Sequence, residues 1–149
     1  MIIDGKQTQS IWYERSTDTV RIIDQTRLPH EFEVIALDCL EDACEAITNM
    51  QVRGAPLIGV TAAYGVYLAL REDPQLIDTA IGDLLSTRPT AVNLQWALQR
   101  AEKAVLDLPV EQRAAMALQT AQLIEKEDIA VCEAIGEHGV GILQKLWEN

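Results

Sequence analysis

The sequence predicts an α+β fold in which a small antiparallel sheet precedes a helical bundle. Runs with strand-like alternation lie before residue 38, helical spacing of apolar residues dominates after it, and no βαβ alternation appears. The chain of 149 residues is 48% hydrophobic and 23% charged, which is enough to bury a core. We therefore expect one domain, with the sheet in residues 1–37 and five or six helices in residues 38–149.

Residues 11–37 contain three runs typical of β-strands. They are IWYER, then TVRIID after a turn-like segment, then FEVIALD after Pro29. In the last two runs, alternate positions are apolar: Val20 and Ile22, then Phe32, Val34 and Ala36. We expect three antiparallel strands that flank the rest of the chain, because so small a sheet rarely stands alone.

A first helix is predicted directly after the sheet. Asp38 is a candidate N-cap, and Glu41 lies three residues later, in the position of a capping box. The following apolar residues keep the spacing of an amphipathic helix that ends near Met50: Leu40, Ala43, Cys44 and Ile47.

The next helix is predicted to be buried on every face. Residues 57–70 carry no charge, and small residues are scattered among large apolar ones. Pro56 suits the first turn of a helix, because its ring fixes φ and its missing N–H would be unpaired there. The helix is therefore expected to begin at about Pro56, and it is too short to span a bilayer.

The start of this helix is a candidate anion site. First-turn amides and the positive end of the helix dipole favour an anion. Arg53 lies just upstream, and Gly54 and Ala55 have so little side chain that a ligand could reach the backbone. The segment is either a phosphate or carboxylate pocket or an ordinary tight turn with a solvated arginine.

A second arginine precedes a later helix. Asp73 and Pro74 open a helix with an apolar stripe, and Arg88 and Pro89 follow it. Pro89 disfavours the α conformation at Arg88, and Thr90 is a good N-cap for the next helix. The stripe of that helix is Leu94, Ala97, Leu98, Ala101 and Val105. One arginine before a helix is common, but two in one chain, each near a proline, favour a shared role.

The rest of the chain predicts a long helix that breaks near its end. The pattern runs from about Glu111 to Ile135, and the charged run 125–128 is expected to be a solvated face. Three glycines, Gly136, Gly139 and Gly141, then predict a break before a short helix over residues 142–147. His138, among these glycines, is either a ligand or base or a loop histidine with a structural role.

Charge and cysteine content exclude several classes of function. Twelve basic and 23 acidic residues give a net charge of −11, which argues against nucleic acid or an anionic membrane as partner. Cys39, Cys44 and Cys132 form no CxxC motif, so we expect neither a structural metal nor a disulfide framework. Cys44 is expected to be a small buried residue of the first helix. No signal peptide is visible, and a cytoplasmic location is the expectation.

Four segments carry a resemblance to a known family. QVRGAPLIG and TRPTAVNL, with DQTRLP at residues 24–29 and IGEHG at residues 135–139, resemble the N-terminal part of methylthioribose-1-phosphate isomerases. The resemblance implies an aldose–ketose isomerisation of 5-methylthioribose 1-phosphate to 5-methylthioribulose 1-phosphate in methionine salvage, without metal or organic cofactor. It also implies that Arg53, Gly54, Ala55 and Arg88 bind the substrate.

The chain lacks the motifs that carry the catalytic residues of this family. The catalytic cysteine and aspartate of the family belong to a second, Rossmann-like domain, and no such motif occurs before residue 149. We therefore expect the N-terminal domain alone, without catalytic residues and inactive by itself. Its expected partners are a sugar phosphate and, in the full-length protein, the missing C-terminal domain and a second subunit of a homodimer. An exposed apolar surface where that domain would dock is also expected.

Three other interpretations remain open at this point. The chain could belong to a ribose-1,5-bisphosphate isomerase, which would need room for a second phosphate. It could instead resemble the non-catalytic regulatory subunits of the translation initiation factor 2B complex, in which this domain serves as an interaction module. A plain helical scaffold is the third. Retention of both arginine motifs favours the enzymes, because a structural subunit needs no phosphate-facing arginines.

Overall fold

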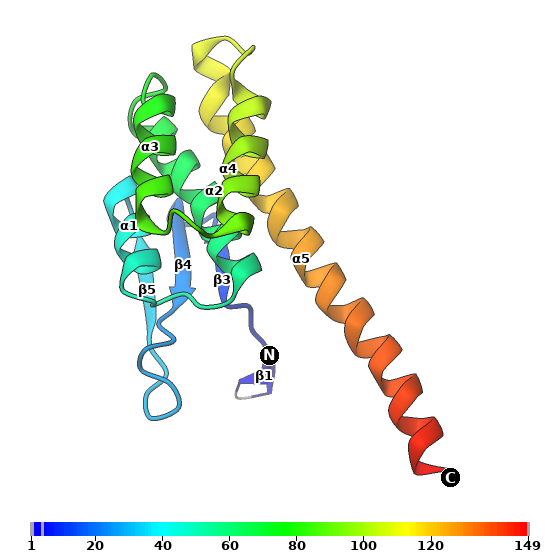
Figure 1. Ribbon diagram of the computed structural model, residues 1–149. Helices are drawn as coiled ribbons and strands as arrows, with labels where there is room; N and C mark the ends of the chain where they lie inside the picture. Colours follow the sequence, from blue (N-terminus) through cyan, green and yellow to red (C-terminus); the bar gives the residue numbers. More distant parts are fainter. Residues whose placement is uncertain (1, 4, 149) are drawn as a thin grey trace.

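The computed structural model describes residues 2–3 and 5–148, and it places a small sheet against a bundle of helices (Figure 1). Within these residues the main sheet has three antiparallel strands in the order β3-β4-β5: β3 (Ile11–Glu14), β4 (Thr19–Ile23) and β5 (Val34–Leu37). Strand β5 contacts helix α1 (Leu40–Thr48), and β3 contacts helix α2 (Ala55–Glu72). The predicted sheet is thus confirmed, and it flanks the helices.

Two details of the sheet differ from the prediction. Phe32 was predicted to belong to the third strand, but β5 begins only at Val34. Phe32 therefore lies outside the strand and is 48% exposed. A short hairpin of β1 (Ile2–Ile3) and β2 (Lys6–Gln7), which was not predicted, precedes the main sheet. Strands of two residues leave too little alternation in a sequence to be recognised.

In the described part of the chain, five helices follow the sheet, as expected. After α1 and α2 come α3 (Ile77–Thr87), α4 (Val92–Val105) and α5 (Val110–Trp147). No strand follows Leu37 within the described residues, so these helices are not part of a βαβ unit. Helix α2 contacts each of the other four helices and forms the centre of the bundle.

The predicted N-caps of two helices were wrong by one residue. The N-cap of α1 is Cys39, not Asp38, because the extended backbone continues through Cys39 at φ −143°. The carboxylate of Asp42, rather than Glu41, accepts hydrogen bonds from the amides of Asp38 and Cys39, at 2.8 and 3.2 Å. The N-cap of α4 is Ala91, not Thr90, because a turn over residues 88–91 precedes the helix.

The starts of the other predicted helices also shift slightly. Helix α2 begins at Ala55, with Pro56 in its first turn. Helix α3 begins at Ile77 rather than at Pro74, because residues 74–76 form a turn. In that turn the carboxylate of Asp73 accepts a hydrogen bond from the amide of Gln75 at 2.9 Å.

Helix α2 is buried without interruption from Ile58 to Leu70, as its uncharged sequence predicts. Its small residues allow neighbouring helices to approach closely. A Cβ atom at Gly65 would lie 3.1 Å from the Cβ of Ala43 in α1 and 3.0 Å from Cδ2 of Leu84 in α3. Close packing of this kind makes the bundle rigid around α2.

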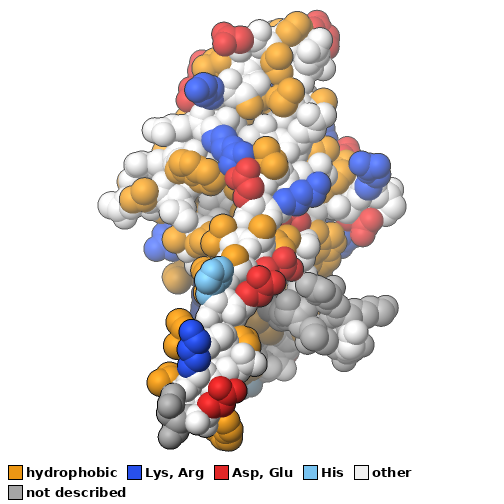
Figure 2. All heavy atoms as spheres, turned by 90° about the vertical axis from the view of Figure 1, so that its right-hand side faces the viewer, with side chains coloured by type: hydrophobic (Ala, Val, Ile, Leu, Met, Phe, Trp, Pro, Cys, Tyr) orange, Lys and Arg blue, Asp and Glu red, His pale blue; other side chains and the backbone are white. Residues whose placement is uncertain are grey.

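Helix α5 is continuous, so the predicted break at three glycines was wrong. Gly136, Gly139 and Gly141 all lie inside the helix, whose remaining residues there include good helix formers such as Ala, Glu, Leu, Gln and Lys. His138 is therefore helical and exposed, and its Nδ1 lies 2.6 Å from the carbonyl oxygen of Ala134. Figure 2 shows apolar side chains along this part of the helix.

A polar cluster fixes the sheet against α2. The hydroxyls of Tyr13 and Tyr67 both donate hydrogen bonds to Oδ1 of Asp18, each at 2.5 Å. These bonds hold the pKa of the Asp18 carboxyl below its usual value. Arg71 pairs with Oδ2 of Asp18 at 3.4 Å and donates to the carbonyl of Asp38 at 2.6 Å. The turn between β3 and β4 and the end of β5 are thus both tied to one helix.

Candidate functional site

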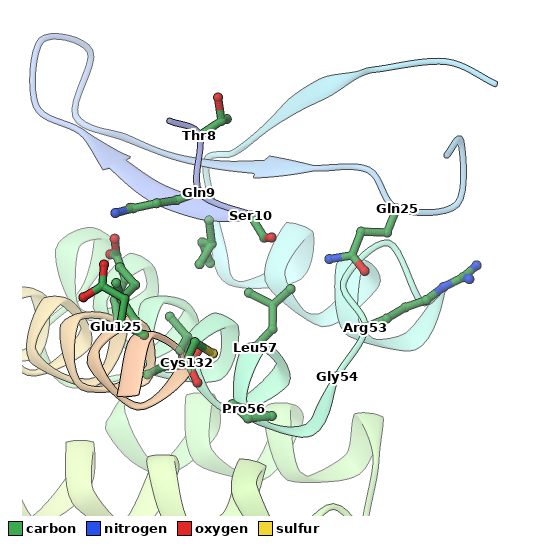
Figure 3. Close-up of a pocket in the computed structure, with 15 residues that line it drawn as sticks. Thr8, Gln9, Ser10, Gln25, Arg53, Gly54, Pro56, Leu57, Glu125 and Cys132 are labelled. Atoms are coloured by element: carbon green, nitrogen blue, oxygen red, sulfur yellow. The ribbon is translucent and has the colours of Figure 1, made fainter. Parts of the chain in front are cut away.

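A pocket of about 410 Å³ lies beside the start of α2 (Figure 3). Its walls come from the segment before β3, from Gln25 after β4, from the first turns of α2, and from one face of α5. Arg53 and Gly54, two of the predicted substrate-binding residues, belong to the wall at the start of α2. Ala55 and Arg88 do not line it.

The loop that carries Arg53 is fixed by a buried carboxylate. Asp24 is 5% exposed, and its carboxylate accepts hydrogen bonds from the amide of Thr26 at 2.9 Å and the side chain of Gln51 at 3.3 Å. Burial alone would raise the pKa of Asp24, but a hydrogen bond from the hydroxyl of Thr26 at 2.6 Å, together with these two, outweighs burial and leaves the pKa below its usual value. The amide of Gln25 also donates to the carbonyl of Gln51, at 2.9 Å. Asp24 and Gln25 thus hold Gln51 in the loop that precedes α2.

Gly54 gives the loop its shape. It is the N-cap of α2 and has φ of +99°, a conformation that side chains rarely adopt. No side-chain cap covers the helix start, where the first amides have no partner within the helix and Pro56 has no amide hydrogen. The first turn of α2 therefore presents backbone donors and the positive end of a dipole beside the pocket.

Arg53 lies at the rim of the pocket and is exposed. Its Nε donates a hydrogen bond to the carbonyl of Met50 at 3.3 Å, and Figure 3 shows its side chain extending away from the pocket centre. Within the described residues no carboxylate pairs with Arg53. Its guanidinium thus keeps most of its donors available to an anion.

Arg88 lies at the start of the neighbouring helix. It has φ −148° and ψ 81°, outside the α region as Pro89 predicts, and its carbonyl accepts a hydrogen bond from the amide of Ala91 at 3.0 Å. Helices α2 and α4 start at the same end of the bundle (Figure 1). Their first turns touch, since a Cβ at Gly59 would lie 2.8 Å from the carbonyl oxygen of Asn93. Arg88 therefore belongs to the same end of the bundle as Arg53, although it is outside the pocket wall.

The α5 wall contains a residue that the sequence analysis missed. The hydroxyl of Tyr64, which is fully buried in α2, donates a hydrogen bond to Oε2 of Glu125. Burial raises the pKa of Glu125, although the hydrogen bond from Tyr64 opposes the rise. Glu125 and Asp128 line the pocket, so the expectation of a solvated face over residues 125–128 was wrong at these two positions.

Helical spacing could have located Glu125. It lies four and eight residues after the buried Ala121 and Ala117, and therefore on the face of α5 that meets α2. Glu127 does lie on the outer side, where it forms a bidentate ion pair with the guanidinium of Arg100. The four charged residues of this run thus divide between two faces.

A second hollow of about 330 Å³ adjoins the pocket and is mostly apolar. Pro56, Val60 and Asp128 line both spaces, and Trp96 and Val131 are among the further walls of the second one. Trp96 is 48% exposed and Val131 is 56% exposed. A ligand that fills both spaces would meet polar groups in the first and apolar side chains in the second.

Neither Cys39 nor Cys44 offers an activated thiolate. Cys44 was expected to be buried, but it is only partly buried, packed against the core. Burial raises the pKa of Cys44 to about 11, and burial is also the main cause that raises the pKa of Cys39. Cys132 is exposed at the edge of the pocket. Among the described residues no group of three or more His, Cys, Asp or Glu could hold a metal ion.

None of the described helices is both long and apolar enough to cross a membrane. The long α5 fails this criterion because acidic and basic residues occur along its whole length.

Three features describe the class of protein to which this chain belongs. It has a helical bundle, a central helix that begins at a glycine, and exposed arginines at the starts of two helices. Comparison with known families identifies this class. A family model described as "Initiation factor 2 subunit family" matches residues 51–146, and the chain belongs to that family.

Relatives in this family include enzymes and a translation factor. The chain is 49% identical over 148 residues to methylthioribose-1-phosphate isomerase of Methylocella silvestris, an alignment that covers 98% of this chain and 40% of the isomerase. Among solved structures, the translation initiation factor eIF-2B subunit delta from A. fulgidus has a TM-score of 0.76 and 37% identity, over 83% of this chain and 38% of its own. For 5-methylthioribose 1-phosphate isomerase from Pyrococcus horikoshii the TM-score is 0.72 and the identity 36%, over 82% of this chain and 37% of its own. The chain thus spans about 40% of the length of the curated relatives it matches.

Proposed function

We propose that this chain is the N-terminal substrate-binding domain of an isomerase that converts 5-methylthioribose 1-phosphate to 5-methylthioribulose 1-phosphate. This is a step of methionine salvage, and we place it in the cytoplasm. Residues 1–149 would form one domain of that enzyme. The pocket at the start of α2, with Arg53 and Gly54 in its wall, is the observation that carries the proposal. The 49% identity to a named isomerase supports it.

The phosphate of the substrate would bind at the start of α2. The first-turn amides next to Gly54 and Ala55 can donate to phosphate oxygens, and the helix dipole favours their charge. Arg53 would swing from the rim toward the phosphate, because only a single 3.3 Å bond to a backbone carbonyl holds it in place. Arg88, at the adjoining helix start, would add a second guanidinium, and charge-assisted bonds of this kind are the strong ones.

The apolar hollow favours methylthioribose 1-phosphate over ribose 1,5-bisphosphate. The methylthio group is apolar and suits a space beside Trp96 and Val131. A second phosphate there would face the carboxylate of Asp128, which also lines the hollow. The other carboxylate of the hollow, that of Glu127, is already paired with Arg100. Like charges at such short range disfavour the bisphosphate.

The chemical step would belong to the remainder of the full-length protein. Aldose–ketose isomerisation moves a hydrogen between neighbouring carbons, and positioned acids and bases typically contribute orders of magnitude to such steps. We assign no catalytic residue to this chain. The resemblance implies a second, Rossmann-like domain that supplies these groups, and a homodimer of the complete enzyme. The 149-residue chain alone is expected to show no isomerase activity.

A second candidate function is an interaction module of a translation factor complex. The TM-score of 0.76 to an eIF-2B subunit delta favours it. Such a module needs no sugar phosphate, so ligand binding separates the two candidates.

The test is calorimetric titration of the 149-residue chain with 5-methylthioribose 1-phosphate. Replacing Arg53 by Ala is expected to weaken binding about tenfold or more, the effect of losing a charged hydrogen bond. Arg88→Ala is expected to weaken it less, because Arg88 lies outside the pocket wall. Arg15→Ala, at an exposed turn of the sheet, is the matched control and should bind like the unmodified chain. Equal affinity of the Arg53→Ala and unmodified chains would disprove the proposal.

A further inference from the structure

Glu125 lies across the pocket from Arg53 (Figure 3). It comes from α5, whereas Arg53 lies in the loop before α2, so the two residues border one space from different segments of the chain. The hydrogen bond from Tyr64 joins residues 61 positions apart in the sequence. Because Tyr64 is fully buried, it fixes the Glu125 carboxylate at a defined place in the wall.

The carboxylate has acceptor capacity beyond this single bond. An ionised carboxylate offers about four acceptor sites, and the hydroxyl of Tyr64 occupies one, on Oε2. Glu125 is half-buried and lines the pocket, so its remaining acceptors are available to a ligand in that space. A half-buried carboxylate is also costlier to keep than a neutral amide, since burial disfavours the charged form. If Glu125 served only to accept the hydrogen bond from the Tyr64 hydroxyl, a neutral amide would be sufficient and the negative charge would not be needed.

The pocket therefore differs chemically from one end to the other. At one end Arg53 and the amides at the start of α2 are donors, and at the other end Glu125 is an acceptor. A ligand that matches both ends has an anionic group at one end and hydroxyl donors a few bonds away. A phosphorylated sugar has this pattern, because its hydroxyls can donate to a carboxylate while its phosphate accepts from a guanidinium.

We propose that Glu125, held by Tyr64, is a substrate-orienting residue whose carboxylate accepts hydrogen bonds from the sugar hydroxyls while Arg53 holds the phosphate. This inference rests on the proposed function and adds to it the group that distinguishes a sugar phosphate from a bare anion. Glu125 would set the rotation of the sugar about its phosphate.

Calorimetric titration of the full 149-residue chain with two probes tests this role. The probes are inorganic phosphate and 5-methylthioribose 1-phosphate. Glu125→Gln keeps the size of the side chain and an acceptor for Tyr64, and it removes the charge. It is expected to weaken binding of the sugar phosphate about tenfold and to leave phosphate binding unchanged. Glu137→Gln, on an exposed position of the same helix outside the pocket wall, is the matched control and should alter neither affinity.

The variants separate this inference from the function on which it rests. If Glu125→Gln binds the sugar phosphate like the unmodified chain while Arg53→Ala weakens both probes, the inference is wrong and the proposed function stands. If Arg53→Ala changes neither affinity, the proposed function fails as well. Equal weakening of both probes by Glu125→Gln would also overturn the inference, because it would indicate general damage to the pocket.

A second variant covers the case in which Glu125→Gln does not fold. Tyr64→Phe keeps the carboxylate and removes the hydroxyl that holds it. It is expected to weaken sugar-phosphate binding about threefold and to leave inorganic phosphate unaffected, as one neutral anchor is lost. Unchanged affinity for the sugar phosphate in this variant would count against the orienting role.

Discussion

Helices α2 and α5 each carry glycines among apolar residues, but the surroundings of these glycines differ. In α2, a Cβ at Gly59 would lie 2.8 Å from a backbone oxygen of α4. In α5, a Cβ at Gly136, Gly139 or Gly141 would meet no atom within 4 Å. The glycines of α2 thus allow neighbouring helices to approach closely. Within the described residues, no neighbouring helix approaches the glycines of α5.

The apolar side chains of the two helices differ in the same way. Those of α2 are buried throughout its length after the first turn. In α5, Ile124 is 3% exposed and Ile129 is partly buried, but the large apolar residues beyond Ile129 are more than half exposed: Val131, Ile135, Val140, Ile142, Leu143, Leu146 and Trp147. Figure 2 shows several apolar side chains on this projecting part. Apolar residues at helical spacing therefore predict a helix without telling what covers it.

The largest expected effect comes from comparing two isoleucines of α5, one buried and one exposed, each replaced by alanine in its own variant. Ile124→Ala removes a side chain packed in the core and is expected to lower the free energy of unfolding by about 3 kcal/mol. Ile135→Ala, at a residue that is 66% exposed, is expected to change it by less than about 0.5 kcal/mol. Urea titration of both variants measures the difference. Equal losses would mean that the end of α5 is buried in solution, for example against a second copy of the chain.

Adding a methyl group to α2 is expected to have the next largest effect. Gly59→Ala places a Cβ against the carbonyl of Asn93, a backbone atom that no side-chain rotation can move away. Helix propensity recovers about 1 kcal/mol, but the clash should leave a net loss of about 2 kcal/mol. Gly82→Ala in α3, where a Cβ meets nothing within 4 Å, is the control and should not lose stability. A stable Gly59→Ala variant would show that the starts of α2 and α4 can separate freely.

The sequence predicted those parts of the fold well in which burial imposes a regular pattern of apolar residues. Alternation located the second and third strands of the main sheet, and the uncharged run after Pro56 located the central helix, because burial on one or all faces requires such patterns. Cap residues were missed by one position. Asp38 and Thr90 are good caps, but extended backbone at Cys39 and a turn over residues 88–91 move the two helix starts one residue further along the chain. Local preference ranks candidates but does not fix the exact residue.

The candidate site was predictable only where it is local in sequence. Arg53 and Gly54 follow from the chemistry of a helix start, and both lie in the pocket wall. Ala55 and Arg88 lie outside that wall, and their role in binding stays a prediction. Glu125 was missed because its partner, Tyr64, is 61 residues away in the sequence, and a charged run ordinarily indicates a solvated face.

Replacing a glycine of α5 by alanine is expected to have the smallest effect, and it tests the contrast between the glycines of α2 and α5. The predicted break failed because each glycine costs a helix only about 1 kcal/mol, and the helix on both sides of it is continuous. Gly139→Ala should therefore raise the helix content seen by circular dichroism slightly and stabilise α5 locally by about 0.5 to 1 kcal/mol. Because a Cβ at Gly139 would meet no atom within 4 Å, the added methyl group has nothing to clash with. Amide hydrogen exchange across residues 131–147 measures the local gain, with Gly82→Ala as the matched exposed glycine. Faster exchange in Gly139→Ala would show that this glycine does permit a close approach, as Gly59 does in α2.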